Sequence, residues 1–393
     1  ADVSLARGGR PLIRAEWNIN FNITINFPSV DVATIGAGGG SIARVDTGGV
    51  LKVGPESAGA RPGPACYRQG GEAPTVTDAN LVLGRLGADT KLAGRVALGL
   101  DLAQTAVDQV AGPLGCSRDE AAAGILSIMR ANMAGAIRLM TVRRGHDPRE
   151  FALAAFGGAG PLHALELAKE LGIPEVVIPY VPGLGSALGV LSVDVRHDFV
   201  QSIFATNSRF DVTEINDAFA DLEARAYGRL TEEGVSDDRM ALHRQLDVRY
   251  YGQVSGGLTL DAGKDKLAEE DVRAIFDSFH EKHTEEYGYT LPADLAELEL
   301  VNARVSAEGA QSAPAAPVFA GATNGEARPS STRQVYFELA GWTETVVYQR
   351  DTLPVGSKIA GPAVIEQLDS TTLVIPGSSI EVDPRRNLIC RVG

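Results

Sequence analysis

The sequence of 393 residues has little cysteine, few aromatic residues and no long apolar run. Its three cysteines, Cys66, Cys116 and Cys390, have neither the close spacing of a metal site nor the even number of a disulfide framework, which predicts a reducing, cytoplasmic environment. Because no apolar run is long enough to cross a bilayer and no signal peptide is recognisable, the sequence argues against a membrane protein.

Positive charge is also scarce. Lys and Arg number 36 against 50 Asp and Glu, which gives a formal net charge of −14. A surface of that sign repels the phosphates of nucleic acids and of anionic lipids. We therefore expect no nucleic-acid partner and no membrane partner. The length allows two domains, or three.

Glycine, by contrast, is concentrated in short loops, of which residues 36–41 (GAGGGS) form the densest. A dinucleotide fingerprint G-x-G-x-x-G would need glycine where Ser41 stands, and no helix follows. A Walker loop would need Gly-Lys-Ser/Thr, which is missing as well. Two interpretations remain: a run of backbone N–H groups that holds an anion, or a tight structural crossover between strands.

A second glycine loop, residues 157–160, lies between a predicted strand over 151–156 and a predicted helix over 161–171. Gly172 and a further strand complete a β-loop-α-β unit. N–H groups at the start of such a helix favour a negatively charged ligand, whereas the alternative is a close strand–helix packing turn. His163, on the first turn, either contacts a nucleotide or substrate or packs internally.

Composition and periodicity divide the chain further. Residues 117–144 open with a capping box, are apolar nearly all round and predict a buried helix. Residues 212–233 and 266–287 predict amphipathic helices, with an alternating strand between them. The predicted domains are 1–205, an α+β domain over 206–308, a linker over 309–333 and a β-rich module over 334–393.

Seven stretches together are more specific than any one of them. They are Asp2-Val3-Ser4-Leu5, IGAGGGSIARVDTGGVLKVGPESAGARPGPACY, PTVTDANLVLGRL, FGGAGPLHALELAKELGI, PGLGSALGVLSVDVRHD, LDVRYYGQ and GPAVIEQLDSTTLVIPG. With them the chain resembles the hydantoinase A / 5-oxoprolinase family, which includes ATP-dependent ketone carboxylase subunits. The resemblance covers the whole chain.

The resemblance implies the second half of an actin-like (sugar kinase/heat-shock type) ATPase fold of the α/β class, followed by an α+β domain and a small β-rich C-terminal module. The family's phosphate motif Asp-x-Gly-Gly-Thr does not occur in this sequence. The resemblance therefore also implies that an N-terminal half, carrying part of the ATP site, lies outside these residues, and that a hydantoinase B-type subunit is a partner in a hetero-oligomer.

By resemblance the cofactors are ATP and Mg²⁺ or another divalent cation, whose ligands stay unassigned. Asp2, in the second phosphate motif, Ser41 and Asp78 are the candidate catalytic residues. Asp78 also fits a helix cap. The candidate nucleotide-binding residues, which come from the two glycine loops and the helix after the second, are Gly36, Gly38, Gly39, Gly40, Gly157, Gly158, Ala159, Gly160 and His163.

Three functions stay open at this point. The first is ATP-dependent hydrolysis of a cyclic amide of hydantoin or 5-oxoproline type, through phosphorylation of the amide oxygen. The second is a subunit of an ATP-dependent acetone- or acetophenone-type carboxylase. The third is a non-catalytic actin-like scaffold. In the first two, the glycine-loop N–H groups would hold the phosphate in transfer or a phosphorylated intermediate.

Overall fold

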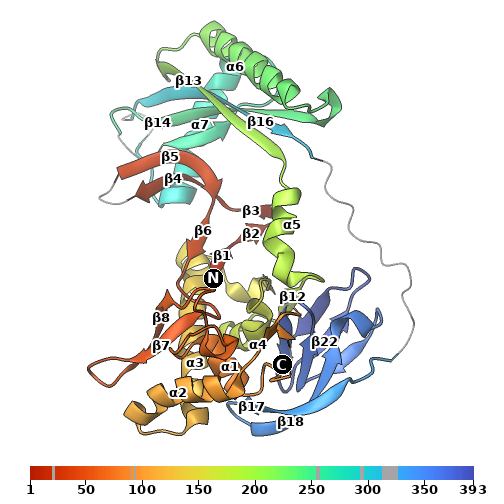
Figure 1. Cartoon of the computed structure of the whole chain (residues 1–393). Coiled ribbons are helices and arrows are strands. Elements are labelled where there is room, and N and C mark those ends of the chain that lie inside the picture. The colour runs from red at the N-terminus through yellow and green to blue at the C-terminus, as the bar shows by residue number, and fades with distance from the viewer. Residues whose placement is uncertain (20–22, 90, 93, 254–256, 293–295, 312–325) are drawn as a thin grey trace. The chain divides into compact units, whose positions relative to one another are not determined.

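The computed structural model describes residues 1–19, 23–89, 91–92, 94–253, 257–292, 296–311 and 326–393. The chain divides into two compact units, one made of residues 1–188 and 316–393 and the other of residues 189–315 (Figure 1). We call them unit 1 and unit 2. Unit 2 is thus inserted into the sequence of unit 1, and each unit has a hydrophobic core of its own.

The first part of unit 1 contains short strands and four of the helices. The strands are β1 (Asp2–Ser4), β2 (Ala6–Arg7), β3 (Arg10–Pro11), β4 (Ile13–Ile19), β5 (Ile23–Val30), β6 (Val32–Thr34), β7 (Ser41–Val45), β8 (Leu51–Ser57), β9 (Lys91–Leu92), β10 (Val96–Ala97), β11 (Ala152–Ala154) and β12 (Glu175–Ile178). The helices are α1 (Val76–Val82), α2 (Leu100–Leu114), α3 (Arg118–Met140) and α4 (Gly160–Leu171). Helix α5 (Gly185–Leu191) begins in unit 1 and ends in unit 2.

The last part of unit 1 is all strand. Its elements are β17 (Ser331–Phe337), β18 (Gly341–Gln349), β19 (Lys358–Ala360), β20 (Ala363–Glu366), β21 (Thr371–Val374), β22 (Ser379–Val382) and β23 (Leu388–Arg391). Strands β17, β18, β20 and β21 form a four-stranded sheet in that order. Strands β22 and β23 instead extend the sheet of β11 and β12, in the order β11-β12-β23-β22-β19.

The predicted β-loop-α-β unit is confirmed. Strands β11 and β12 pair in parallel, α4 lies between them in the chain, and Gly172 ends the helix with a φ of +70°. The positive φ explains the glycine, since other residues rarely adopt it. Helix α4 packs against β12, β21 and α3, so this unit lies in the core that both parts of unit 1 share.

Helix α3 differs from its prediction. Its capping box, in which Ser117 accepts from the N–H of Glu120, is confirmed, but the helix is not buried all round. The helical stretch Arg118–Arg144 is, by length and composition, long and apolar enough to cross a membrane. Only half of its most apolar window is buried, and Arg130 forms ion pairs with Glu166, Glu170 and Glu338 of unit 1. These contacts are those of a core helix with one open face.

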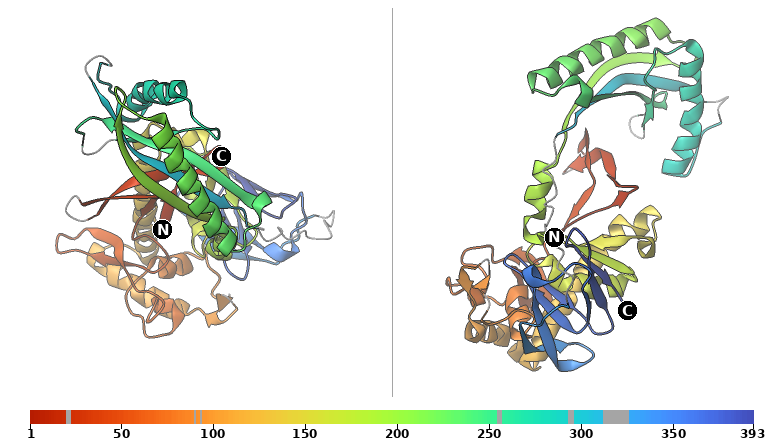
Figure 2. Two further views of the ribbon diagram at one scale, coloured as in Figure 1. Left: turned by 90° about the horizontal axis from the view of Figure 1, so that it is seen from above. Right: turned by 90° about the vertical axis from the view of Figure 1, so that its right-hand side faces the viewer.

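Unit 2 is a curved antiparallel sheet covered by two helices (Figures 1 and 2). Its elements are β13 (Val195–Thr206), α6 (Val212–Glu232), β14 (Met240–Tyr250), β15 (Leu258–Asp261), α7 (Glu269–Tyr287) and β16 (Leu298–Gly309). The sheet order is β13-β16-β14-β15. Alternate residues of β14, namely Leu246, Val248 and Tyr250, are buried with α6 and α7, as the period of two requires.

The two compact units divide the chain differently from the predicted domains. The boundary at 205 falls at the end of β13, which pairs with β16 along nearly its whole length and therefore belongs to unit 2. The predicted separate module over 334–393 is joined to unit 1, because β23 pairs with β12 and one core spans both parts. Most of the predicted linker, residues 312–325, lies outside the described residues.

Candidate functional site

The first glycine loop is a tight turn that follows β6 and leads into β7. Ser41 closes it: the N–H of Ser41 donates to the Gly38 carbonyl at 3.1 Å, and its hydroxyl accepts from the N–H of Gly38 at 2.9 Å and donates to the Gly36 carbonyl at 3.2 Å. Ser41 is buried, and its hydroxyl is engaged on both sides. The geometry therefore favours a structural use of Ser41, and its predicted catalytic role stays a prediction.

Three glycines of this loop are required by close packing of the chain. A Cβ on Gly36 would lie 2.6 Å from Pro55 Cβ and 2.8 Å from its Cα. A Cβ on Gly39 would lie 2.8 Å from the hydroxyl of Thr77, and one on Gly40 would lie 2.8 Å from the hydroxyl of Ser57. Gly38 is different, because a Cβ there would meet nothing within 4 Å. The structural interpretation thus accounts for three of the four glycines.

The second glycine loop is open where the first is packed. Cβ atoms built on Gly157 and Gly160 would meet nothing within 4 Å, and one on Gly158 would meet only the carbonyl oxygen of Asp369, at 3.6 Å. Gly157 has a φ of +85°, a conformation that favours glycine. Helix α4 begins at Gly160 without a side-chain cap. Pro161 has no N–H and the N–H of Leu162 donates to the Ala159 carbonyl at 3.2 Å, so the first turn offers an anion the N–H of Gly160.

The two loops meet, although more than a hundred residues separate them. A Cβ on Gly39 would lie 3.8 Å from the Cβ of Ala159. The carbonyl of Gly39 is fixed by the N–H and the hydroxyl of Thr77, each at 2.8 Å. Among the described residues, the N–H groups of Gly39, Gly40, Gly158 and Ala159 have no protein acceptor. Unpaired N–H groups of this kind, gathered beside a helix N-terminus, suit a phosphate.

The second glycine loop is supported by residues for which the sequence suggests no chemical role. The loop between β20 and β21, residues 367–370, contacts both Gly158 of the second glycine loop and Gly183. Ser370 donates from its hydroxyl to the Gly158 carbonyl at 3.2 Å, and the carboxylate of Asp369 accepts from the N–H of Gly183 at 2.8 Å. The available signal was the motif GPAVIEQLDSTTLVIPG, which resembled the family but carried no chemical assignment.

Asp2 lies on β1, next to the strand that leads into the first loop. Strand β1 pairs with β6, and the carboxylate of Asp2 accepts from the hydroxyl of Thr34 at 2.7 Å. Thr34 is two residues before Gly36, so Asp2 is an exposed carboxylate at the edge of the loop. Its second oxygen is available to a cation. The predicted catalytic role of Asp2 stays a prediction.

Asp78 has the surroundings of a structural residue. Its carboxylate is fully buried and accepts from the N–H groups of Ala65 at 3.3 Å, Cys66 at 2.8 Å and Thr75 at 2.9 Å, and from the Thr75 hydroxyl at 2.7 Å. It thereby forms a capping box for α1 and fixes the 54–67 loop on that helix. The helix-cap interpretation is confirmed, and four accepted hydrogen bonds leave the carboxylate little capacity for other chemistry.

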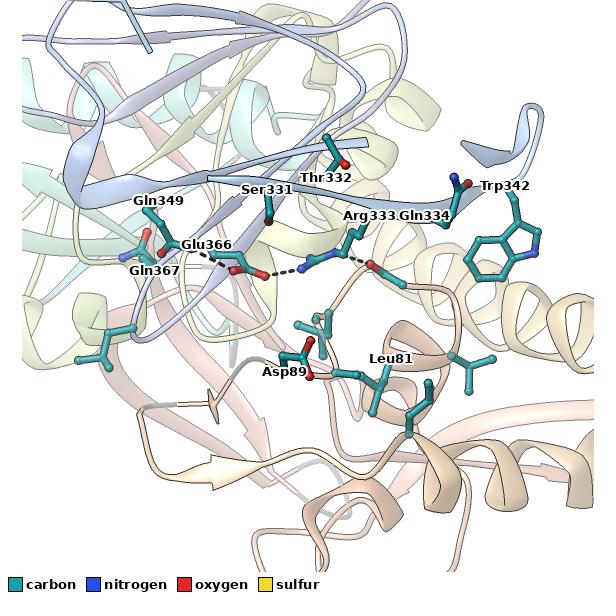
Figure 3. Close-up of a pocket in the computed structure, with 17 residues that line it drawn as sticks. Leu81, Asp89, Ser331, Thr332, Arg333, Gln334, Trp342, Gln349, Glu366 and Gln367 are labelled. Atoms are coloured by element: carbon teal, nitrogen blue, oxygen red, sulfur yellow. Dashed lines mark hydrogen bonds and ion pairs between the residues drawn. The ribbon is translucent and has the colours of Figure 1, made fainter. Parts of the chain in front are cut away.

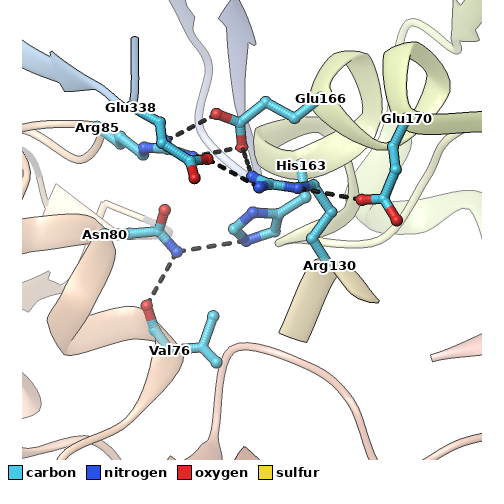
Figure 4. Close-up of polar contacts among 8 residues, drawn as sticks. All are labelled: Val76, Asn80, Arg85, Arg130, His163, Glu166, Glu170 and Glu338. Atoms are coloured by element: carbon cyan, nitrogen blue, oxygen red, sulfur yellow. Dashed lines mark hydrogen bonds and ion pairs between the residues drawn. The ribbon is translucent and has the colours of Figure 1, made fainter. Parts of the chain in front are cut away.

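His163 does not face the glycine loops. It is buried at 2 % exposure, and its Nε2 lies 3.3 Å from Nδ2 of Asn80, whose amide also donates to the Val76 carbonyl at 2.9 Å (Figure 4). Burial first, and then the guanidinium of Arg85, lower the pKa of His163 to about 3. The ring is therefore neutral at physiological pH and packs internally. Its predicted contact with a nucleotide stays a prediction that the geometry disfavours.

A buried ion-pair network surrounds this histidine (Figure 4). Arg85 pairs with Glu166 through two hydrogen bonds of 2.8 Å, and Arg130 reaches the same carboxylate at 3.3 Å. Burial raises the pKa of Glu166, but the two guanidinium groups outweigh burial and lower it overall. The network joins the end of α1 to α3 and α4, so it stabilises the helices that carry the loops.

A pocket of about 850 Å³ lies elsewhere in unit 1, between the end of α1 and the sheet of β17 and β18 (Figure 3). Its central cation is Arg333, which pairs with Glu366 and donates to the carbonyls of Gly84 at 2.8 Å and Arg85 at 2.9 Å. The guanidinium of Arg333 donates to all of these partners. Arg333 therefore joins the two parts of unit 1 and is not a free ligand-binding group.

No group of three or more His, Cys, Asp or Glu residues within the described parts of the chain could hold a metal ion by itself. A magnesium ion does not need such a group, because it takes one or two carboxylates together with phosphate oxygens and water. Asp2, beside the first loop, fits that requirement.

Two family models match the chain and together cover most of it. The family model "Hydantoinase/oxoprolinase" matches residues 1–199, and "Hydantoinase/oxoprolinase C-terminal domain" matches residues 205–389. The chain belongs to this family.

Three relatives illustrate its range. The caprolactamase subunit alpha of Pseudomonas jessenii is 36% identical over 98% of this chain. The solved structure of the ATP-dependent caprolactamase from that organism superposes with a TM-score of 0.82 at 35% identity. The match covers 100% of this chain and 57% of the caprolactamase chain. The acetophenone carboxylase gamma subunit of Aromatoleum aromaticum is 33% identical over 95% of this chain, and 5-oxoprolinase 1 of Arabidopsis thaliana is 34% identical over 90%.

This chain is shorter than these relatives. It spans 55% of the caprolactamase subunit, 51% of the acetophenone carboxylase subunit and 28% of 5-oxoprolinase 1. The matched regions of these proteins therefore correspond to a part of each of them.

Proposed function

We propose that this chain is the nucleotide-binding part of an ATP-dependent enzyme that hydrolyses a cyclic amide. The observation that carries the proposal is the meeting of the two glycine loops, where the N–H groups of Gly39, Gly40, Gly158 and Ala159 have no acceptor among the described residues. An ATP-dependent caprolactamase and a 5-oxoprolinase among the relatives supply the substrate class. The actin-like ATPase fold, of which this chain would form one half, is part of the same proposal.

In the proposed reaction, ATP would transfer its γ-phosphoryl group to the amide oxygen and leave as ADP. Water would then add to the amide carbon, the ring C–N bond would break with the nitrogen taking up a proton, and hydrolysis would release phosphate. The four unpaired N–H groups and the N-terminus of α4 stabilise negative charge on phosphate oxygens, without a side chain competing for the space. Asp2 is the carboxylate placed to hold the cation. Ser41 and Asp78 act on the site indirectly, by fixing the first loop and the chain beneath it.

A carboxylase subunit is the second candidate. The identity to the caprolactamase subunit, 36%, and the identity to the acetophenone carboxylase subunit, 33%, are too similar to separate the two reactions. Both reactions would begin with phosphoryl transfer to a carbonyl oxygen at the same phosphate-binding parts. In the hydrolase, water adds to the carbonyl carbon and the C–N bond breaks, whereas in the carboxylase the enol carbon of the ketone attacks a carboxyl donor. A hydantoinase B-type partner subunit, and the further chain implied by the relatives' greater length, belong to either proposal.

The proposal is tested by ATP turnover of the intact protein together with any subunit that co-purifies with it. ADP release would be measured with hydantoin, 5-oxoproline, caprolactam, and a ketone plus bicarbonate. Turnover that depends on a cyclic amide supports the hydrolase and identifies its substrate class. Turnover that depends on ketone and bicarbonate replaces it with the carboxylase. A protein that neither binds nor hydrolyses ATP contradicts both and leaves the scaffold.

A further inference from the structure

The C-terminal strands of unit 1 complete its sheet and also support the second glycine loop. The β20–β21 loop, residues 367–370, makes polar contacts on both sides of the second glycine loop. On one side Ser370 donates to the Gly158 carbonyl. On the other side Asp369 accepts from Gly183, and the neighbouring Pro182 carbonyl accepts from the N–H of Gly157 at 2.7 Å. The glycine loop is thus held between two segments that the β20–β21 loop fixes.

The fit at Gly183 is close. A Cβ on Gly183 would lie 2.6 Å from Oδ2, 2.7 Å from Cβ and 2.9 Å from Cγ of Asp369. Only glycine lets the carboxylate reach the backbone here, because any larger residue would displace it. The N–H group of Gly183 and the side chain of Asp369 therefore form a matched pair.

The other carboxylate oxygen of Asp369 is held by a chain of polar contacts. Its Oδ1 accepts from Nε2 of Gln367 at 2.6 Å, and Oε1 of Gln367 accepts from Arg350 at 3.1 Å. Arg350 is almost fully buried and also donates to the carbonyls of Ile178 at 3.1 Å and Pro179 at 2.9 Å, at the end of β12. These contacts fix the carboxylate relative to the sheet that carries the loop.

The charges of Arg350 and Asp369 favour the same placement of the Asp369 carboxylate. Burial lowers the pKa of Arg350 to about 10, and the negative charge of Asp369 acts in the opposite direction. Among the described residues, Arg350 donates to carbonyl and amide oxygens, and the nearby carboxylate of Asp369, which accepts from Gln367, contributes compensating negative charge.

We propose that Asp369 is a positioning residue for nucleotide binding: it holds Gly183, and through Pro182 it holds Gly157, so that the N–H groups of Gly158 and Ala159 stay aligned for phosphate. The inference rests on the proposed function. It extends that function by assigning part of the phosphate-binding geometry to the C-terminal strands, which contribute no group of their own to the phosphate.

The test is a double-mutant cycle in the intact protein, with any co-purifying subunit. The variants are D369A, G183A and the double variant, with G112A on α2 as the matched control, because a Cβ at Gly112 meets nothing within 4 Å. The measurements are the Kd for Mg²⁺-ATP by calorimetry, kcat at saturating ATP, and Tm. Since G183A acts by displacing Asp369, it remains informative if D369A folds poorly.

We expect D369A and G183A each to raise the Kd for ATP at least tenfold, with kcat at saturating ATP within about threefold of wild type. In the D369A background, G183A should add little, because the carboxylate it displaces is gone. G112A should leave the Kd unchanged. An unchanged Kd in D369A, or fully additive effects, would overturn the inference while the proposed function stands. Absence of ATP binding by the wild-type protein would overturn both.

Discussion

The two glycine loops have similar compositions but owe their glycines to different causes. In the first loop, Gly36, Gly39 and Gly40 are glycines because Pro55, Thr77 and Ser57 occupy the space of a side chain. In the second loop, a Cβ on Gly160 would meet open space, whereas Gly157 is also favoured as glycine by its φ of +85°. A run of glycines therefore does not by itself indicate a ligand. The comparison separates residues that the fold needs from residues that leave room for a bound group.

The largest effect is expected beneath the first loop, at Asp78. D78A would leave the N–H groups of Ala65, Cys66 and Thr75 without their acceptor in a fully buried position, which should lower the free energy of unfolding by about 4 kcal/mol. Urea denaturation measures this. The control D108A, at an exposed ion pair with Arg118, should cost no more than about 1 kcal/mol. A D78A protein of wild-type stability that has lost turnover would restore the catalytic assignment.

The next test is inside the first loop. G36A should cost about 3 kcal/mol, because the new methyl group would overlap the backbone of Pro55, which cannot move aside cheaply. G38A, two residues further on, should change stability by less than about 0.5 kcal/mol, because nothing lies within 4 Å. Thermal unfolding of the pair gives the comparison directly. Equal losses in the two variants would show that packing does not explain these glycines.

A side chain added to the second glycine loop should weaken ATP binding and leave the stability of the protein nearly unchanged. G160V places a branched side chain in the open space at the start of α4, and it should weaken ATP binding by about tenfold to a hundredfold, with Tm within about 2 °C of wild type. Calorimetry with Mg²⁺-ATP and a melting curve measure the two quantities. If Tm fell and the Kd stayed the same, the second loop would be a packing turn like the first.

The smallest effect at neutral pH concerns His163, for which the sequence left open a nucleotide contact or internal packing and which the fold buries. Its folded-state pKa of about 3 lies below the usual value of 6.5, so the unfolded chain binds the extra proton first and stability falls as pH drops from 6.5 toward 3. The slope contributed is at most about 1.4 kcal/mol per pH unit. H163Q should flatten that acid limb in urea titrations. An ATP affinity that titrates with His163 would instead place it at the ligand.

The elements that local signals determine could be predicted from the sequence. The capping boxes at Thr75 and Ser117, the β11-α4-β12 unit and its terminal Gly172 each depend on residues a few positions apart. The two glycine loops could also be singled out as a site. Their packing could not, because the atoms that explain Gly36 belong to Pro55 and those that fix Gly183 belong to Asp369. Such contacts depend on the tertiary fold.

For the same reason, the sequence does not show which strands the compact units pair together. Strand β13 looks like the end of the first domain because the composition changes after it, but its partner is β16, about a hundred residues later. Strand β23 likewise belongs to β12. Strand pairing across an insertion leaves no local signature in the sequence.

The pairing of β12 with β23 has a consequence for biosynthesis. The ribosome releases β11 and β12 first, then the whole of unit 2, and only afterwards the strands that complete their sheet. Unit 2, which is continuous in the chain, can fold while the C-terminal strands are still being translated. During that interval one edge of β12 has no partner, and a chaperone that binds exposed strands would have its clearest target there.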